Sequence, residues 1–518
     1  MKFSPQQSRF LDWCAQGSGS SVLVAVAGAG KTTTLLAGVE RIAGQVAILA
    51  YNRKISEEIK AKLVERGIEF RKAQAGTCHS FGFNAYRKAF PRARVVEDKV
   101  AKIVEARIPD EMKSAAAPIA KLIGLAKQSA FGIVGPIDDA AAWAALADHH
   151  DVFDEPEEGD PLDPAEAIAF AIGALKVSNR DTDTVDFDDM IYLPLLLRVR
   201  FWRFDAVMID EAQDTNAARR ALVRALVRPG GRVIAVGDPA QAIYGFTGAD
   251  ADSIDLIAKD FNAIRLPLTV TYRCPKAVVA FARQWVDHIE AHESAPAGSV
   301  EQLTAAQFVD RFVTPAALDA SMAILCRVTK PLVALAFRLI ARGIACRVEG
   351  REIGAGLKKL AGKWKSARTT DKLRHRLEDF LARETTRYLA KGQEARAQEV
   401  DDRVQTLLCI IDAVETAGGS TVAAVDARID EIFADNVSGV LVLSTIHKSK
   451  GREWPTVFWL DRKGTCPSPW ARKDWQIGQE NNLCYVAATR AQERLIEIPS
   501  ISDMPIAKPA ADATTTAA

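Results

Sequence analysis

Apolar runs and amphipathic stretches alternate along the first 270 residues. From Ser20 to Ala50 the chain carries two apolar runs, VLVAVA and VAILA, on either side of a glycine-rich turn and an amphipathic segment. Short runs rich in Val, Ile and Leu indicate buried strands, and this order predicts a parallel βαβ unit. The runs FDAVMID (204–210) and RVIAVGD (232–238) are similar and end in acidic residues, where ligand sites of open α/β sheets usually lie. The pattern predicts a first parallel sheet between about residues 20 and 270.

The stretch between the early and late strands has a different pattern. Residues 91–182 are rich in alanine and have the apolar spacing of helices, with an acidic polar interruption at 149–164. A second α/β pattern begins at SMAILCR (321–327) and recovers strands at GVLVLSTIH (439–447) and PTVFWLD (455–461), beyond a segment at 351–435. Each sheet is therefore predicted to be interrupted by a mostly helical insertion.

Length and composition narrow the class of protein. The chain has 518 residues, of which 48% are hydrophobic and 26% charged, and these values are ordinary for globular domains. At roughly 150 residues a domain, three to four domains are expected. No apolar run approaches the roughly 18 residues of a membrane span, and the first residues lack a signal-peptide pattern, so we expect a cytoplasmic protein. The eight cysteines form no C-x-x-C pair, which favours reduced, partly buried thiols over zinc ribbons or disulfide frameworks.

Charge is balanced over the whole chain and unbalanced within one segment. The 67 basic and 66 acidic residues give a formal net charge of +1, which does not indicate a nucleic-acid partner. Residues 351–391 hold twelve Lys and Arg against five Asp and Glu, whereas 392–435 hold three against ten. A solvated helical face is the ordinary explanation, and a nucleic-acid contact by the basic half is the sharper alternative. The small and polar residues of 501–518 predict a disordered tail.

The segment AVAGAGKTTT (25–34) has the context of a phosphate-binding loop, because it follows a predicted strand and opens a helix. Gly28 and Gly30 allow backbone N–H groups to turn inward, Lys31 can reach the β- and γ-phosphates, and Thr32 can hold Mg²⁺. Ala25 stands where the usual pattern has its first glycine, so the loop by itself is a moderate signal for ATP or GTP.

A second half-site follows at VMIDEAQD (207–214), where an apolar strand delivers two neighbouring carboxylates. Asp210 can bind Mg²⁺ while Glu211 orients and deprotonates the attacking water, a division that nucleotide hydrolysis needs. A solvent-facing acid pair at a strand end is the ordinary alternative, and it is improbable beside a phosphate-binding loop. The two segments together predict a nucleotide hydrolase.

The order of the remaining motifs resembles that of the UvrD/Rep-like group of superfamily 1 DNA helicases, over about residues 3–496. The segments that carry the resemblance are FSPQQ (3–7, the Q motif), AVAGAGKT (25–32, motif I), ILAYNRKI (48–55, Ia), TCHSF (77–81, Ib), DFDDM (186–190), VMIDEAQD (II), GDPAQAIYGFTGA (237–249, III), TYRCP (271–275, IV), STIHKSKGREW (444–454, V) and LCYVAATRA (483–491, VI).

The resemblance implies an α/β fold of two RecA-like P-loop NTPase domains with parallel sheets, with ATP between them. The implied organisation comprises a first motor domain (1A, 1–90 and 183–270), its helical insertion (1B, 91–182), a second motor domain (2A, 271–350 and 436–500), a short helical insertion (a reduced 2B, 351–435) and the tail at 501–518.

The resemblance also implies individual roles at the nucleotide. Arg273 and Arg490 occupy the positions of two arginines that reach the γ-phosphate, where a guanidinium stabilises transition-state charge. Gln7 would read adenine, Tyr272 would stack on it, and Glu453 would contact the ribose. The implied ATP-binding set is Gln7, Ala27, Gly28, Ala29, Gly30, Lys31, Thr32, Thr33, Tyr272, Arg273, Glu453 and Arg490; the catalytic set is Lys31, Glu211, Gln241, Arg273 and Arg490, with Thr32 and Asp210 for Mg²⁺. A core position for Tyr272, a surface ion pair for either arginine and a solvated Glu453 are the ordinary alternatives.

Single-stranded nucleic acid is bound by a polar backbone track with aromatic platforms on which bases stack. By motif position, the residues that resemble the family's DNA groove are Tyr51, Asn52, Thr77, His79, Tyr244, Phe246 and His447. Aromatic residues in helices and turns belong more often to the core than to base platforms, so Phe246 is a better candidate than Tyr51 or Tyr244.

Two departures from the family pattern bear on function. Thr247 stands where the family usually has an arginine, which removes a cation near the expected DNA path, and the second insertion is shorter than usual. We expect an ATP-dependent 3′-to-5′ DNA helicase and single-stranded DNA translocase that acts on single strands and their junctions with duplex, with polarity implied by the resemblance alone. A translocase that strips proteins with little unwinding and a nucleotide-gated DNA-binding protein remain alternatives. Repair, replication restart, recombination control and phage replication all stay open as pathways.

Overall fold

The computed structural model describes residues 3–153, 163–245, 248, 252–314, 317–340, 342, 344–364, 366–390, 394–433, 439–471 and 473–504. The chain divides into two compact units, Met1–Thr269 and Val270–Ala518. Each contains a six-stranded sheet in which all neighbouring strands are parallel, so the predicted fold class is confirmed.

The first unit is built on the sheet β3-β2-β6-β7-β1-β8. Its strands are β1 (Ser21–Ala25), β2 (Val46–Ala50), β3 (Ala73–Thr77), β6 (Phe204–Ile209), β7 (Val227–Gly237) and β8 (Ile264–Leu268). The helices that accompany them are α1 (Pro5–Gln16), α2 (Lys31–Arg41), α3 (Arg53–Glu65), α4 (Cys78–Ala89), α9 (Asp189–Leu196), η2 (Ala212–Asp214), α10 (Ala217–Leu226), η3 (Pro239–Gln241) and α11 (Ser253–Asp260). The strands β1, β2 and β6 and the second half of β7 are apolar and mostly buried, so they read as continuous hydrophobic runs in the sequence, whereas β3 and β8 are partly exposed.

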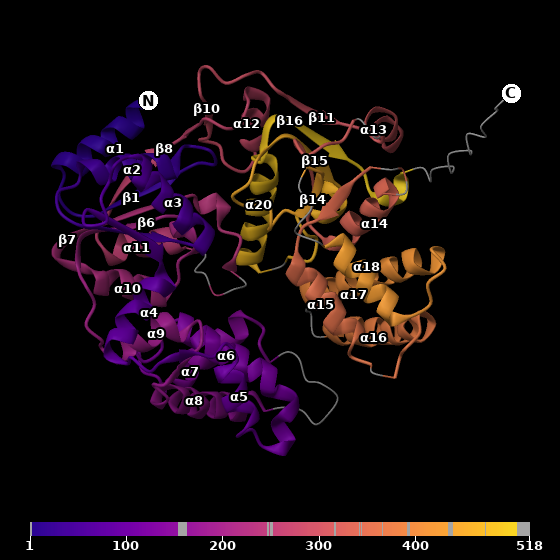
Figure 1. The fold of residues 1–518 in the computed structure, drawn as a ribbon, viewed down its shortest axis with the longest axis horizontal. Helices are drawn as coiled ribbons and strands as arrows, with labels where there is room; N and C mark the ends of the chain where they lie inside the picture. Colours follow the sequence, from indigo (N-terminus) through magenta and orange to yellow (C-terminus); the bar gives the residue numbers. More distant parts are fainter. Residues whose placement is uncertain are drawn as a thin grey trace. The chain divides into compact units, whose positions relative to one another are not determined.

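The predicted first insertion is helical and has its own core. It contains β4 (Arg94–Val95), α5 (Lys99–Glu105), η1 (Asp110–Ala115), α6 (Ala116–Gln128), α7 (Ala140–His149), α8 (Pro164–Arg180) and β5 (Thr184–Val185). Figure 1 shows α5–α8 gathered beside α4 and α9, whose Tyr86 and Tyr192 join the insertion's core. Most of the acidic interruption, residues 154–162, lies outside the described residues.

A buried ion-pair network joins this insertion to the segment at the start of α9. Lys127 of α6 contacts Asp186 at 2.6 Å and Asp189 at 2.7 Å, and Lys99 of α5 contacts Asp189 at 2.8 Å. The side chains of Lys127 and Asp189 are fully buried. Buried charges are tolerated only when they are paired, so this network fixes α5 and α6 against the start of α9.

The second unit is built on the sheet β11-β16-β15-β12-β14-β13. Its strands are β11 (Ser299–Gln302), β12 (Met322–Cys326), β13 (Cys346–Val348), β14 (Leu441–Thr445), β15 (Trp454–Leu460) and β16 (Ala491–Ile498), beside a small parallel pair of β9 (Val270–Thr271) and β10 (Glu290–Ala291). Its helices outside the insertion are α12 (Lys276–Ala282), α13 (Ala305–Phe312), α14 (Thr329–Ile340), α19 (Arg462–Thr465), α20 (Asp474–Ala488) and η5 (Ile501–Asp503).

The second insertion consists of α15 (Arg351–Ala361), α16 (Thr370–Ala390), α17 (Glu394–Thr416) and α18 (Val422–Ile432), which lie beside α14 (Figure 1). One hydrophobic core runs from the sheet into these helices, through Leu443 of β14 and Leu407 of α17. Its basic and acidic halves meet: Arg374 contacts Asp412 and Glu415, each at 2.7 Å. Lys358 contacts Asp430 at 2.5 Å. The opposite charges of the halves therefore pair in part with each other.

Three other expectations can be compared with the structure. All eight cysteines are free and six are buried, as predicted. Residues 501–503, assigned from the sequence to a disordered tail, form η5, and Met504 packs into the core; residues 505–518 lie outside the described part. Among the described residues, none of the helices has the length and hydropathy required to cross a bilayer.

Candidate nucleotide and nucleic-acid sites

The phosphate-binding loop joins β1 to α2. Gly28 and Gly30 adopt positive φ angles of 71° and 76°, a conformation that glycine adopts without strain, and the loop also includes Ala27 and Ala29. Lys31 is the first residue of α2, and Thr32 and Thr33 follow in its first turn. The open N–H groups of a helix N-terminus and its dipole favour an anion there, so this segment has the geometry of a phosphate site.

Two polar contacts link this loop to the acidic pair that follows β6. The Nζ atom of Lys31 lies 3.2 Å from Oε2 of Glu211, and the hydroxyl of Thr32 donates to Oδ2 of Asp210 at 3.2 Å. Glu211 has φ 52° and ψ 48°, which is left-handed backbone in a non-glycine residue. Such conformations are uncommon and concentrate at functional sites. The two half-sites predicted from separate motifs are therefore adjacent in space.

The electrostatics of this cluster are dominated by carboxylates. Burial, with the neighbouring Glu211 carboxylate, raises the pKa of Asp210, and burial also raises the pKa of Asp238. Burial acts to lower the pKa of Lys31, but the charges of these three acids outweigh it, so that pKa lies above its ordinary value. Three acids face one ammonium group, an excess of negative charge that a divalent cation would relieve.

Two glutamines connect the acids to motif III. The amide of Gln241 donates to Oδ2 of Asp238 at 2.6 Å, and Gln213 donates to Oε2 of Glu211 at 2.6 Å. The side-chain oxygen of Gln213 accepts the Asp238 N–H at 3.0 Å. Gln241 is a predicted site residue, whereas Gln213 and Asp238 stand inside quoted motifs without an assigned role. Both could have been proposed from the sequence, because each places a polar side chain within a few residues of the end of a predicted strand.

Gln7 lies behind the phosphate-binding loop. Its side chain is buried, completes a capping box with Ser4 at the start of α1 and donates to the hydroxyl of Thr34 at 2.8 Å. Gln6 is bound to the other end of the unit, because its amide accepts the N–H of Thr269 at 2.8 Å and donates to that residue's hydroxyl at 2.9 Å. Adenine recognition by Gln7 remains a prediction.

In the second unit, Arg273 is held by acidic and carbonyl groups. Its guanidinium forms an ion pair with Glu453 and donates to the carbonyl of Thr489 at 3.4 Å. The other oxygen of Glu453 accepts from Gln492 at 2.9 Å. Tyr272, at 44% exposure, has its ring 4.9 Å from that of His292. The structure thus brings Arg273 and Glu453 together, while Tyr272 keeps an accessible ring.

Arg490 is fully buried at the end of α20. Its guanidinium donates to the carbonyls of Val486 at 2.9 Å and Arg452 at 3.0 Å, and to the Thr489 hydroxyl at 3.1 Å. Burial and the nearby charge of Arg273 lower its pKa to about 9. Both predicted arginines are therefore engaged with groups of their own unit.

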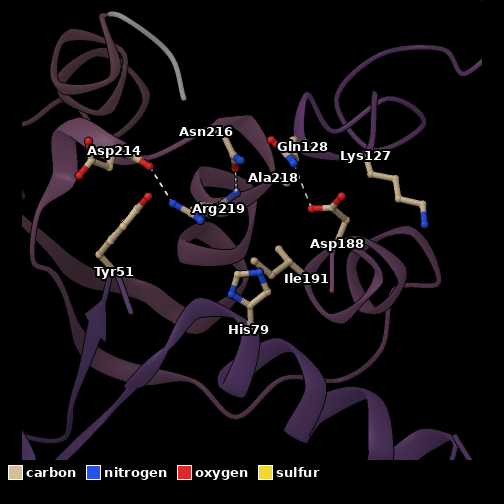
Figure 2. A pocket seen from close by; sticks show the side chains of 10 residues that line it. All are labelled: Tyr51, His79, Lys127, Gln128, Asp188, Ile191, Asp214, Asn216, Ala218 and Arg219. Atoms are coloured by element: carbon tan, nitrogen blue, oxygen red, sulfur yellow. Dashed lines mark hydrogen bonds between the residues drawn. The ribbon is translucent and has the colours of Figure 1, made fainter. Parts of the chain in front are cut away.

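A polar cavity of about 270 Å³ lies within the first unit, where α4, α6, α9 and α10 meet the segments that follow β2 and β6 (Figure 2). Residues from five segments line it, including Tyr51, His79, Gln128, Asp188, Asp214 and Arg219. Gln128 donates to Oδ1 of Asp188 at 3.2 Å, and burial raises the pKa of Asp188 to about 6. A β-carbon added at Gly248, near the end of motif III, would clash with the Gln128 amide, so motif III reaches this cavity's rim.

The predicted DNA residues have different surroundings in the structure. Tyr51 and His79 line the cavity, where burial and Arg219 lower the pKa of His79 to about 4 and leave it neutral at neutral pH. The rings of Tyr51 and Tyr244 stack at 5.9 Å, and Arg219 lies 5.3 Å over the ring of Tyr51, so neither tyrosine is an open platform.

Other predicted DNA residues have local roles or lie elsewhere. Asn52 and Thr77 cap α3 and α4 by accepting from the N–H groups of Ile55 and Ser80. His447 is half-buried in the second unit, where burial and nearby cations lower its pKa to about 3. Phe246 and Thr247 lie outside the described residues. Arg219 and Gln128 were not predicted, since their convergence with the motif residues depends on tertiary packing. Asp188 stands inside the DFDDM motif (186–190), to which the sequence analysis assigned no role.

Two family models match the chain. The UvrD/REP helicase N-terminal domain matches residues 7–262, and the UvrD-like helicase C-terminal domain matches residues 365–500. Between them they cover well over half of the chain, in the order that the motifs predict. The chain belongs to the UvrD/Rep-like helicase family. The enzyme class predicted from the sequence, an ATP-dependent DNA helicase, agrees with this membership.

Curated relatives are distant. The chain is 24% identical over 550 residues to the ATP-dependent DNA helicase UvrD2 of Mycobacterium tuberculosis, an alignment that covers 92% of this chain and 76% of UvrD2. It is 26% identical over 302 residues to a probable DNA helicase II homolog of Mycoplasma pneumoniae, covering 54% of this chain and 42% of the relative. It is 24% identical over 302 residues to Rep of Escherichia coli, covering 53% and 41%. The chain therefore spans less than half the length of two of these UvrD/Rep-like relatives.

Proposed function

We propose that this UvrD/Rep-like protein is an ATP-dependent 3′-to-5′ single-stranded DNA translocase that unwinds duplex at single-strand junctions. The observation that carries the proposal is the cluster at the phosphate-binding loop, in which Lys31, Asp210 and Glu211 face one another. A protein that only binds nucleotide does not need a second carboxylate beside the Mg²⁺ ligand. The polarity rests on the family resemblance.

The side chains fit a magnesium nucleotide. Thr32 and Asp210 would hold Mg²⁺, which neutralises phosphate charge when bound, and the excess of carboxylates in the cluster is the observation that supports it. Lys31 would bind the β- and γ-phosphates in exchange for its contact with Glu211. Glu211, released from that contact, would orient and deprotonate the attacking water, with Gln241 positioned by Asp238 near the γ-phosphate.

The second unit would supply the charge that completes hydrolysis. We propose that Arg273 and Arg490 reach the γ-phosphate when ATP is bound, where a guanidinium accelerates phosphoryl transfer by about 1,000-fold or more. Alternating states with and without the γ-phosphate would then grip and release the strand.

Steady-state ATP hydrolysis with and without a thymidine oligonucleotide tests the proposal, with Glu211→Gln as the control. Strong stimulation that the control lacks supports a DNA-dependent motor. Duplexes with 3′ or 5′ single-stranded tails then test polarity and unwinding, and we expect displacement only from the 3′-tailed duplex. Stimulation without displacement would favour a translocase that strips bound proteins, and absent stimulation would overturn the motor assignment.

A further inference from the structure

Arg219 lines the cavity, and its guanidinium has no carboxylate partner among the described residues. Its Nη1 donates to the backbone carbonyl of Asp214 at 2.7 Å, and its guanidinium lies over the ring of Tyr51. Within the described part of the chain it forms no ion pair with a carboxylate, whereas the other cavity cation, Lys127, is paired with Asp186 and Asp189. Figure 2 shows the Arg219 side chain between Tyr51 and Asn216. A half-buried cation at a polar cavity favours an anionic ligand.

The carbonyl that Arg219 binds belongs to the turn that carries the catalytic acid. Asp214 ends η2, and its N–H donates to the carbonyl of Glu211 at 3.0 Å, which closes the turn. Glu211 begins that turn in left-handed backbone, and Gln213 within it donates to the Glu211 carboxylate. A shift of the Asp214 carbonyl would therefore move this turn, and the first residue of the turn, Glu211, contacts Lys31.

We propose that Arg219 binds a phosphodiester of the single strand and transmits strand occupancy to Glu211 through the Asp214 carbonyl. The inference rests on the proposed function and names the residue that couples its two sites. Arg219 also supplies a cation to a chain whose sequence has Thr247 at the motif III position where the family pattern usually has an arginine. When the strand phosphate takes over part of the guanidinium's hydrogen bonding, the turn shifts and the Lys31–Glu211 contact is weakened. Arg219 is thus a strand-contacting and positioning residue rather than a catalytic one.

The neighbouring arginine provides a matched control. Arg220 lies one residue along α10 and forms an ion pair with Asp260 at 3.2 Å, away from the cavity lining. Arg220→Gln therefore removes the same charge from the same helix without touching the proposed route. Arg219→Gln removes both charge and donor geometry, and Arg219→Lys keeps the charge but not the planar guanidinium.

The experiment measures ATP hydrolysis and binding of a labelled thymidine oligonucleotide by the full chain, at several salt concentrations. We expect Arg219→Gln to raise the half-saturating oligonucleotide concentration about tenfold and to reduce the log–log salt slope by about 0.7, the value for one lost phosphate contact. Arg219→Lys should keep the slope yet lose most of the stimulation at saturating oligonucleotide. Arg220→Gln should match the parent chain, and thermal melting checks that each variant is folded.

Distinct outcomes overturn the two proposals. If the parent chain is stimulated and Arg219→Gln is indistinguishable from it, or if Arg220→Gln loses as much as Arg219→Gln, the role of Arg219 is wrong while the proposed function stands. If Arg219→Gln does not fold, full stimulation of Arg219→Lys at saturating oligonucleotide overturns the coupling route. If the parent chain neither binds the oligonucleotide nor responds to it, the proposed function fails and this inference fails with it.

Discussion

The two halves of the predicted ATP site differ in how their charges are accommodated. In the first unit, the acids Asp210, Glu211 and Asp238 crowd around the single ammonium of Lys31, and burial raises the pKa of Asp210 and Asp238. In the second unit, Arg273 and Arg490 are satisfied by a carboxylate and by backbone carbonyls. The first half keeps unfavourable charge in place for a ligand, whereas the second half integrates its charge into the fold. Removing a carboxylate from the first half should therefore stabilise the ligand-free fold, whereas removing an arginine from the second half should destabilise it.

The largest expected effect is the loss of turnover in Lys31→Ala. Lys31 is the cation of the cluster, and without it no ammonium group offsets the charges of the phosphates and the three carboxylates, so we expect hydrolysis to fall to background while the chain stays folded. Steady-state hydrolysis and circular dichroism measure the two properties. Normal turnover in this variant would refute the phosphate-binding loop and, with it, the contrast between the half-sites.

A second comparison separates the two arginines. Arg273→Ala and Arg490→Ala should each reduce turnover about 1,000-fold or more, because each removes a guanidinium from the γ-phosphate. Arg490→Ala should also lower the free energy of unfolding by about 2 to 4 kcal/mol, since it leaves buried carbonyls of Val486 and Arg452 unpaired. Arg273→Ala should change it by less than about 1 kcal/mol, because its partner Glu453 is partly exposed. Urea unfolding of both variants checks this, and equal stability losses would contradict it.

The opposite sign is expected for Asp210→Asn. In the folded chain the pKa of Asp210 is raised to about 6 from an ordinary value of 3.8, so the carboxylate destabilises the ligand-free fold as pH rises through this range. Below about pH 3 the acid is largely protonated in both states, and the variant should match the parent. Above about pH 7 the variant should be more stable by about 1 to 3 kcal/mol, yet inactive. Unfolding of ligand-free protein at the two pH values measures the difference, and a variant destabilised at the higher pH would disprove it.

Sequence patterns predicted the first half-site better than the second. The loop with Gly28 follows β1, and Glu211 follows β6, so each half of the site is a short continuous motif. A parallel sheet brings the carboxyl ends of its strands to one edge, so Lys31 and Glu211 could be placed together from the sequence. The positions of Arg273 and Arg490 could be assigned by motif, but their present partners could not, because those depend on packing between β15, α20 and β16.

The cavity was not predictable for the same reason. Arg219 lies on α10, His79 on α4 and Gln128 on α6, and no spacing in the sequence signals that these helices meet. Tyr51 shows the opposite case of a residue that its motif position marks as a base platform. Its ring is covered by Tyr244 and Arg219. Motif position predicts which residues lie near a site, whereas burial and pairing decide which of them are accessible.

The smallest expected effect concerns Glu453→Gln, and it tests how firmly the second half-site holds its arginine. Glu453 is partly exposed, so its ion pair with Arg273 is worth under about 1 kcal/mol. If ATP must take Arg273 from this carboxylate, the variant should lower KM for ATP by about two- to fivefold with kcat little changed. Gln492, which donates to the same carboxylate, gives the control: Gln492→Ala leaves the ion pair in place and should leave KM unchanged. A KM that rises in Glu453→Gln would instead indicate that Glu453 contacts the ribose, as the family pattern implies, and that Arg273 is not retained by it.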